Sequence, residues 1–240
     1  MVIRKVSKRG MDHKDNCEDS SLFAVHNDLI FMGVFDGCSS GTDSHFASIL
    51  FTKIFKKSFD TIKNLYGGDP VIFANTLLNS VYKELTNVFN VLSLSSIEML
   101  STINIFVGDI KTKKGISTII GDGSFYVNGK KIIDIDPPGN APFYITYYIE
   151  KGIAYDKAMN GFFINLVENF NDVSVCSDGI NTYKNTSGIN ATEFAEEYLL
   201  RDKYLAKNKM MLNRKCNILT KVNLMNHSDD LSVVRYIEEI

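Results

Sequence analysis

Residues 29–37 read LIFMGVFDG, and this stretch sets the first constraint on the fold. Leu29–Phe35 is a continuous apolar run, which predicts a strand buried on both faces. Asp36 and Gly37 follow it directly, so a carboxylate is held rigidly at a strand end, beside a glycine that lets the backbone approach a ligand closely. Two later blocks share this chemistry, namely CSDG at residues 176–179 and SDDLSVV at residues 228–234. Three such carboxylates brought together would form an oxygen-rich site for a hard divalent metal ion.

The composition is that of a globular chain without a dominant charge. The chain has 240 residues, of which 45% are hydrophobic and 22% are charged, and its formal net charge is −2. No internal repeat, low-complexity tract or linker divides it, so we expect one domain over residues 1–240. Because the chain has no basic field, neither nucleic acid nor an anionic membrane is expected as a partner.

The sequence also gives no sign of export or membrane insertion. The basic start leads into the polar stretch Asp12–Asp19 instead of an apolar signal segment. The longest clean apolar run, Leu29–Phe35, is far shorter than the roughly 20 residues that a membrane helix needs. The four cysteines are widely spaced and include no C-x-x-C pair, so neither a zinc site nor a disulfide framework is indicated. We therefore expect a reducing, cytoplasmic setting.

Apolar periodicity predicts clusters of strands separated by pairs of helices. Strands are expected at residues 2–7, 20–25, 29–35, 102–109, 115–120, 124–127, 130–135, 144–149, 173–176 and 231–237. Helices are expected at residues 44–59, 70–92, 191–205 and 209–222, with Asp69 as the cap of the second, and Pro137-Pro138-Gly139 marks a loop. Consecutive strands joined by short turns predict antiparallel sheets, and paired helices predict a cover on their outer faces. This pattern indicates an α+β fold in the form of a layered sandwich.

Six short blocks, taken in order, resemble a known family. They are Asn16-Cys17-Glu18-Asp19-Ser20, Val34-Phe35-Asp36-Gly37, Ser101-Thr102, Gly121-Asp122-Gly123-Ser124, Ser177-Asp178-Gly179 and Asp229-Asp230-Leu231-Ser232. Together they run from about residue 14 to residue 234 at plausible spacings. In this order they resemble the metal-dependent (type 2C) serine/threonine protein phosphatases.

The resemblance implies a four-layer α-β-β-α sandwich, in which two antiparallel sheets are flanked by helix pairs. It also implies a binuclear Mg²⁺ or Mn²⁺ site at one end of the sheets. By position, Asp36 would bridge the two ions and the carbonyl oxygen of Gly37 would bind one of them. Asp178 and Asp229 would bind the other ion, with Asp229 preferred to its neighbour because it is the first residue of its block.

Further acidic residues would lie around this pair of ions if the resemblance holds. Glu18 and Asp19 would act through metal-bound waters or as ligands at the edge of the site. Asp122 could hold a third ion together with Asp178. Thr182, however, stands where the family has the other acid of that third site, so a third ion stays open and Asp122 could instead shape its turn.

The implied activity is the hydrolysis of phosphoserine and phosphothreonine in proteins by a metal-activated water, without a covalent enzyme intermediate. Hydrolysis of phosphate monoesters is among the slowest uncatalysed reactions, so the site must lower the barrier greatly. Two ions roughly 3.5–4 Å apart can do so by clamping both the attacking and the leaving oxygen. The partners implied are a phosphorylated protein substrate and a cognate serine/threonine kinase system, and the protein is expected to be a monomer.

The chain departs from the family at two of its three expected catalytic residues, Lys14, Asp36 and Cys38. Lys14 replaces an arginine that grips the phosphate, which keeps the charge but loses the bidentate fork. Cys38 replaces a histidine proposed as the acid for the leaving group. Near two dications a thiol would tend to ionise, so we hypothesise that Cys38 is not the general acid and that good leaving groups are preferred. His45 would be the best substitute acid.

Three other interpretations remain open at this stage. Residues 37–41 match G-x-S-x-G, and Asp178 and His227 follow Ser39 in the chain order of the α/β-hydrolases, which would make Ser39 a nucleophile. Asp134-Ile135-Asp136 is similar to the start of aspartyl-phosphate phosphatases. A third interpretation is a non-catalytic module of the same fold that binds a phosphoprotein or a regulatory partner.

Overall fold

Two five-stranded antiparallel sheets form the centre of the computed structural model, which describes residues 1–137 and 142–238. The first sheet has the order β1 (Val2–Lys8), β12 (Leu231–Ile237), β9 (Asp172–Cys176), β6 (Gly123–Val127) and β7 (Lys130–Ile135). The second has the order β2 (Asp19–His26), β3 (Leu29–Asp36), β4 (Ile103–Asp109), β5 (Lys114–Ile120) and β8 (Phe163–Glu168). A short ribbon of β10 (Tyr183–Asn185) and β11 (Met225–His227) is separate from both.

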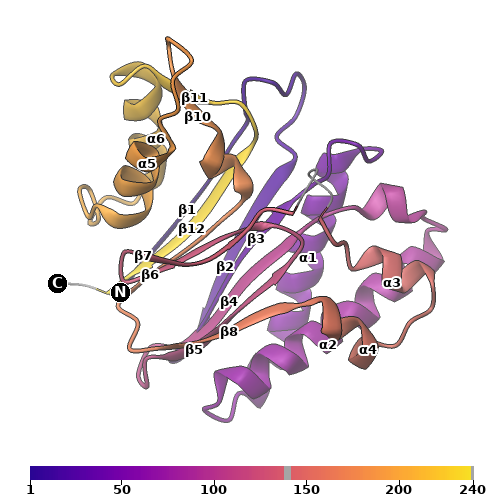
Figure 1. Cartoon of the computed structure of the whole chain (residues 1–240). Helices are drawn as coiled ribbons and strands as arrows, with labels where there is room; N and C mark the ends of the chain where they lie inside the picture. The colour runs from indigo at the N-terminus through magenta and orange to yellow at the C-terminus, as the bar shows by residue number, and fades with distance from the viewer. Residues whose placement is uncertain (138–141, 239–240) are drawn as a thin grey trace.

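Helices cover the outer face of each sheet, as Figure 1 shows. The second sheet carries α1 (Ser44–Ile62) and α2 (Pro70–Val91), with the short α3 (Thr146–Glu150) and α4 (Tyr155–Ala158) beside them. The first sheet carries α5 (Thr192–Glu196) and α6 (Met211–Lys221). The predicted α+β sandwich of two antiparallel sheets with helices outside is therefore confirmed. No helix in the described ranges combines the length and the apolar character needed to cross a bilayer.

Strand β3 shows how the sequence directs a carboxylate into the space between the sheets. Phe31 and Phe35 point outward into the cluster beneath α1 and α2, whereas Met32 and Val34 point inward and pack against the first sheet. Successive side chains of a strand alternate between its faces, so Asp36 belongs to the inward set. Strand β3 therefore places the carboxylate of Asp36 at the end of the apolar core between the two sheets.

Most of the predicted elements are present, including the cap of α2, where Asp69 Oδ1 accepts hydrogen bonds from the backbone N–H groups of residues 71 and 72. The strand predicted at residues 144–149 is wrong, because this segment contains the helix α3. Its aromatic and β-branched residues favour a strand, yet Ile145 and Ile149 are four residues apart and both join the core beside α2. Strand β8 was not predicted, because at the edge of the sheet Phe163, Ile164 and Leu166 are all exposed and show no alternation.

The helix predicted at residues 191–205 is shorter than expected. It is α-helical only over Thr192–Glu196, continues as a π-helical turn over Glu197–Arg201, and then stops. Arg235 of β12 is fully buried beneath this turn and pairs with both carboxylate oxygens of Asp172. Its guanidinium also donates to the carbonyl oxygens of residues 199, 201 and 202, so a cation from the sheet ends the helix. The predicted loop at Pro137-Pro138-Gly139 includes two residues, 138 and 139, outside the described ranges.

The contact between β3 and α1 can be tested through Phe31, which is fully buried. Its ring lies 5.7 Å from that of Phe55 and 5.8 Å from that of Phe59, measured between centroids. Phe31→Ala should lower the free energy of unfolding by about 3–5 kcal/mol, because it removes an aromatic ring and leaves a cavity. Phe23→Ala, on the neighbouring strand at 37% exposure, is the control and should cost less than about 1 kcal/mol. Urea unfolding measures both, and equal losses would contradict this description of the core.

Candidate metal centre

Two carboxylates lie directly opposite each other where the second sheet ends. Asp19 of β2 pairs with Asp36 of β3 in the antiparallel register. The backbone of Asp36 is fixed by Thr102, whose N–H donates to the Asp36 carbonyl at 2.8 Å and whose Oγ1 accepts from the Asp36 N–H at 3.2 Å. Gly37 follows where a Cβ atom would lie 2.1 Å from the carbonyl oxygen of Ser44, so only glycine fits. Like charges directly opposite on neighbouring strands repel, so this pair is unfavourable when both carboxyls are ionised.

The first sheet brings Asp178 and Asp229 to the same end of the sandwich. Asp178 follows β9 and opens a 3₁₀ turn, and Asp229 precedes β12. Ser177 links the two sheets, because its hydroxyl donates to Asp19 Oδ2 at 2.7 Å. Gly179 permits close packing of the two loops, since a Cβ atom there would lie 1.8 Å from the carbonyl oxygen of Asp230.

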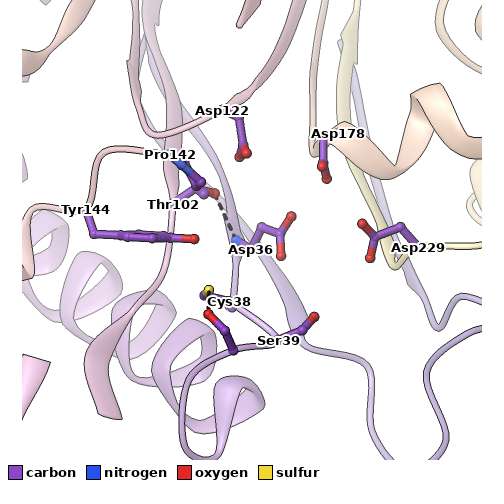
Figure 2. A pocket seen from close by; sticks show the side chains of 11 residues that line it. Asp36, Cys38, Ser39, Thr102, Asp122, Pro142, Tyr144, Asp178 and Asp229 are labelled. Carbon is purple, nitrogen blue, oxygen red and sulfur yellow. Dashed lines mark hydrogen bonds between the residues drawn. The ribbon is translucent and has the colours of Figure 1, made fainter. Parts of the chain in front are cut away.

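Asp122 comes from the turn between β5 and β6, and it completes a group of four carboxylates around one cavity. Figure 2 shows Asp36, Asp122, Asp178 and Asp229 pointing toward a common space. The cavity has a volume of about 250 Å³ and is lined by Asp36, Gly37, Cys38, Ser39, Ser40, Thr102, Asp122, Pro142, Tyr144, Asp178 and Asp229. Its opposite wall carries Cys38, Ser39 and Tyr144, so one side is acidic and the other offers neutral polar groups.

Burial raises the pKa of every carboxyl in this group, and repulsion within the group adds to the rise at Asp36, Asp122 and Asp178. The pKa of Asp36 is well above its ordinary value because of burial first, and then because of the charges of Asp19 and Asp178. Burial followed by the charge of Asp178 raises the pKa of Asp122 to about 7. Burial followed by the charge of Asp229 raises the pKa of Asp178 to about 6, and burial also raises the pKa of Asp229. The ionised cluster is thus unfavourable by itself.

Divalent cations fit this arrangement. Oδ1 of Asp19 and Oδ1 of Asp178 are both buried and accept no hydrogen bond within the described part of the chain. A buried carboxylate oxygen without a partner is costly, and bound metal is one way in which such oxygens are satisfied. The surrounding ligand atoms are carboxylate and carbonyl oxygens, which are the donors that Mg²⁺ and Mn²⁺ prefer.

The structure places the residues expected at the site in three groups. Six line the cavity: Asp36, Gly37, Cys38, Asp122, Asp178 and Asp229. Asp19 is buried opposite Asp36, and Glu18 lies just outside, where its Oε2 accepts from Ser39 Oγ at 2.6 Å. Lys14 lies on an exposed loop, and neither its side chain nor that of His45 lines the cavity. The structure therefore brings the expected acidic residues together but leaves the expected phosphate-binding lysine outside.

Two ring-bearing side chains near the site, Tyr144 and His13, were not predicted to act there. Tyr144 lines the cavity, with its hydroxyl pointing inward in Figure 2, and burial followed by contact with Cys38 raises its pKa. The place of Tyr144 at the cavity could not be predicted, because the sequence of its segment favours a strand. His13 was not among the residues expected at the site, yet its ring lies 3.2 Å from Asp229 Oδ1. A single histidine on a polar loop carries no signal that would have revealed this contact.

The serine-hydrolase interpretation finds no support in these contacts. Ser39 donates to Glu18, whereas Nδ1 of His227 lies 2.6 Å from the carbonyl oxygen of Asp229. The ring of His227 packs against Tyr183 and does not line the cavity that contains Ser39. In the other rival motif, Asp134 pairs with Lys131 at the edge of the first sheet.

Comparison with known proteins agrees with this geometry. A sequence model of the family described as Protein phosphatase 2C matches residues 8–211, and no match was found among curated proteins. A solved bacterial serine phosphatase is 14% identical with a TM-score of 0.60, over 99% of each chain. Serine/threonine phosphatase Stp1 from Staphylococcus aureus is 13% identical with a TM-score of 0.61, over 100% of this chain and 96% of that one. The catalytic domain of the serine threonine protein phosphatase PstP, in complex with 2 manganese ions, is 14% identical with a TM-score of 0.58, over 99% of this chain and 99% of that one.

The raised pKa of Asp122 predicts how stability depends on pH in the presence of a chelator. Its pKa is about 7 in the folded protein and near 3.8 when unfolded, so the folded state binds more protons between these values. Stability should therefore fall as pH rises from 5 to 8. Asp122→Asn removes this titrating carboxyl. The urea concentration at the midpoint of unfolding should therefore fall less between pH 5 and pH 8 in this variant than in wild type. If wild type and Asp122→Asn show the same dependence on pH, the repulsion described for this cluster is contradicted.

Proposed function

The chain belongs to the protein phosphatase 2C family, and on that premise we propose that it hydrolyses phosphoserine and phosphothreonine in proteins at a binuclear Mg²⁺ or Mn²⁺ site. Members of this family are metal-dependent phosphoprotein phosphatases. We place the site in the cavity shared by the two sheets. The observation that carries the proposal is the convergence of four carboxylates from both sheets, together with two buried carboxylate oxygens that have no hydrogen-bond partner among the described residues.

The proposed ligands follow from the position of each residue. Asp36 lies between Asp19 on its own sheet and Asp178 on the other, and it would bridge the two ions, with the carbonyl of Gly37 as a further ligand. Asp178 and Asp229 would hold the second ion. When bound, the ions would supply charge neutralisation and an activated water for attack on phosphorus. Asp122 would be a further acid beside these ligands. Whether it holds a third ion together with Asp178 stays open.

The charge of the cavity explains why the reaction should require metal. A phosphate monoester is itself an anion, and the cavity wall that it must approach carries four carboxylates. Without cations both would repel each other, so binding and chemistry should be lost together. The opposite wall, with the hydroxyl groups of Ser39 and Tyr144, would then face the substrate and orient it by hydrogen bonds.

Lys14 is proposed to reach the phosphate from outside the cavity. The loop that carries it is adjacent to the site, since the preceding residue His13 contacts Asp229. The long, exposed side chain of a lysine can turn toward a bound anion, although it offers a point charge instead of a planar fork. We also propose that the partners are a phosphorylated protein substrate and a cognate serine/threonine kinase system. The protein is proposed to be cytoplasmic and monomeric.

Metal dependence and the two central aspartates provide the first test. Hydrolysis of an aryl phosphate should need added Mn²⁺ or Mg²⁺ and should stop when a chelator is added. Asp36→Asn and Asp178→Asn should each lower the rate at least about 100-fold, because each removes a ligand from ions that contribute several kcal/mol. Asp60→Asn on the exposed face of α1 is the control and should leave the rate unchanged. Full activity in both site variants would refute the proposal, and absence of turnover in metal-loaded wild type would favour a binding module.

The second test concerns the acid for the leaving group. Cys38 lines the cavity, and its sulfur lies 3.0 Å from Ser40 Oγ. If Cys38 supplies no proton, Cys38→His should raise the rate on a phosphoserine peptide at least about 10-fold, since a general acid typically contributes more than this. The rate on an aryl phosphate should change less, because its leaving group needs no proton. Cys38→Ser is the control, and an unchanged or lower peptide rate in Cys38→His would contradict the hypothesis.

A further inference from the structure

His13 bridges two neighbouring aspartates at the edge of the cavity. Its Nε2 lies 3.2 Å from Asp229 Oδ1, and its Nδ1 lies 3.0 Å from Asp230 Oδ2. A ring with its proton on Nε2 donates to Asp229, a ring with its proton on Nδ1 donates to Asp230, and a doubly protonated ring donates to both. Only a ring that carries a proton on Nε2 therefore holds Asp229, which lines the cavity, whereas Asp230 does not line it.

Asp230 gives the ring a rigid support. Its side chain is only 1% exposed, and its Oδ1 accepts a hydrogen bond from the N–H of Gly10 at 2.6 Å. Its Oδ2 accepts from the N–H of Glu18 as well as facing His13. Both oxygens are therefore used to fix the loop before β2. This is why the neighbouring group of His13, Glu18 and Asp230 is not itself proposed as an ion site, although its ligand atoms lie within 4.8 Å of one another.

The backbone and one carboxylate oxygen of Asp229 are held by neighbouring residues. Its N–H donates to Thr182 Oγ1 at 3.2 Å, and its carbonyl oxygen lies 2.6 Å from Nδ1 of His227. Within the described residues, both contacts to its carboxylate are made to Oδ1, by His13 Nε2 and by the N–H of Asp230 at 2.8 Å. The second oxygen is thereby left for the cavity, where Figure 2 shows the carboxylate pointing toward Asp36.

We propose that His13 is a positioning residue, which holds Asp229 Oδ1 so that the other oxygen of this carboxylate is directed at a divalent cation. The proposal rests on the metal-dependent function proposed above. A carboxylate on a loop can rotate about its Cα–Cβ bond, and each orientation that turns away from the ion weakens binding. Partners that orient a metal ligand typically change metal affinity 10–100-fold when they are removed. His13 thus acts on the cation through Asp229 and does not touch it.

Three variants separate this role from a purely structural one. The amide nitrogen of His13→Gln can occupy the place of Nε2 and donate to Asp229, whereas that of His13→Asn can occupy the place of Nδ1 and reach only Asp230. His13→Ala removes both contacts. Mn²⁺ binding is measured by isothermal titration calorimetry on the whole chain, with Asp229→Asn as the reference for loss of the ligand. Thermal unfolding in chelator verifies that each variant is folded.

The expected result is that His13→Gln binds Mn²⁺ within about threefold of wild type, while His13→Asn and His13→Ala bind at least about tenfold more weakly. If Gln and Asn behave alike, whether both retain or both lose affinity, the assigned contact with Asp229 is overturned. Retention by Asn with loss by Gln would assign His13 to the Asp230 loop instead, which also overturns it. Failure of the proposed function looks different, because wild type itself would then bind no Mn²⁺ at the cavity.

Discussion

The opposition of Asp19 and Asp36 across neighbouring strands is the constraint on which the rest of the site depends. Two carboxylates in register, buried between sheets and joined by Asp122 and Asp178, repel each other strongly. Burial raises the pKa of all four carboxyls, so their ionised forms are unfavourable together. The fold must therefore hold them rigidly, and in the proposed site a divalent cation would resolve the repulsion. On this proposal, stability is given up locally so that the metal can bind between the sheets.

This rigidity comes from hydrogen bonds that link the two sheets at the end where the carboxylates lie. Ser177 joins Asp19 of one sheet to the backbone of Ser232 in the other, through bonds of 2.7 and 2.9 Å. Asp230 fixes the loop before β2 from the opposite strand. These contacts connect residues more than 50 positions apart in the chain, so the site forms only when both sheets are assembled. Folding and metal binding should then support each other.

Much of this could be predicted from the sequence, because a strand and the residue that ends it are local features. The continuous apolar run Leu29–Phe35 predicts a buried strand that ends at Asp36, and the order of the acidic blocks indicates one shared site. The rest depends on contacts that no local pattern encodes. Tyr144 belongs to a segment whose composition favours a strand, and the position of Lys14 depends on how its loop packs. The contact of His13 with Asp229 joins residues 216 positions apart, which propensity alone does not reveal.

The central claim is that the carboxylates of both sheets bind divalent cations in one cavity. Crystals grown with Mn²⁺ and measured at the manganese absorption edge test it most directly, because anomalous scattering locates the metal without reference to activity. The account predicts anomalous peaks in the cavity of Asp36, Asp178 and Asp229, at sites that disappear in crystals of Asp36→Asn. Peaks confined to surface carboxylates, or an empty cavity at saturating Mn²⁺, would contradict it.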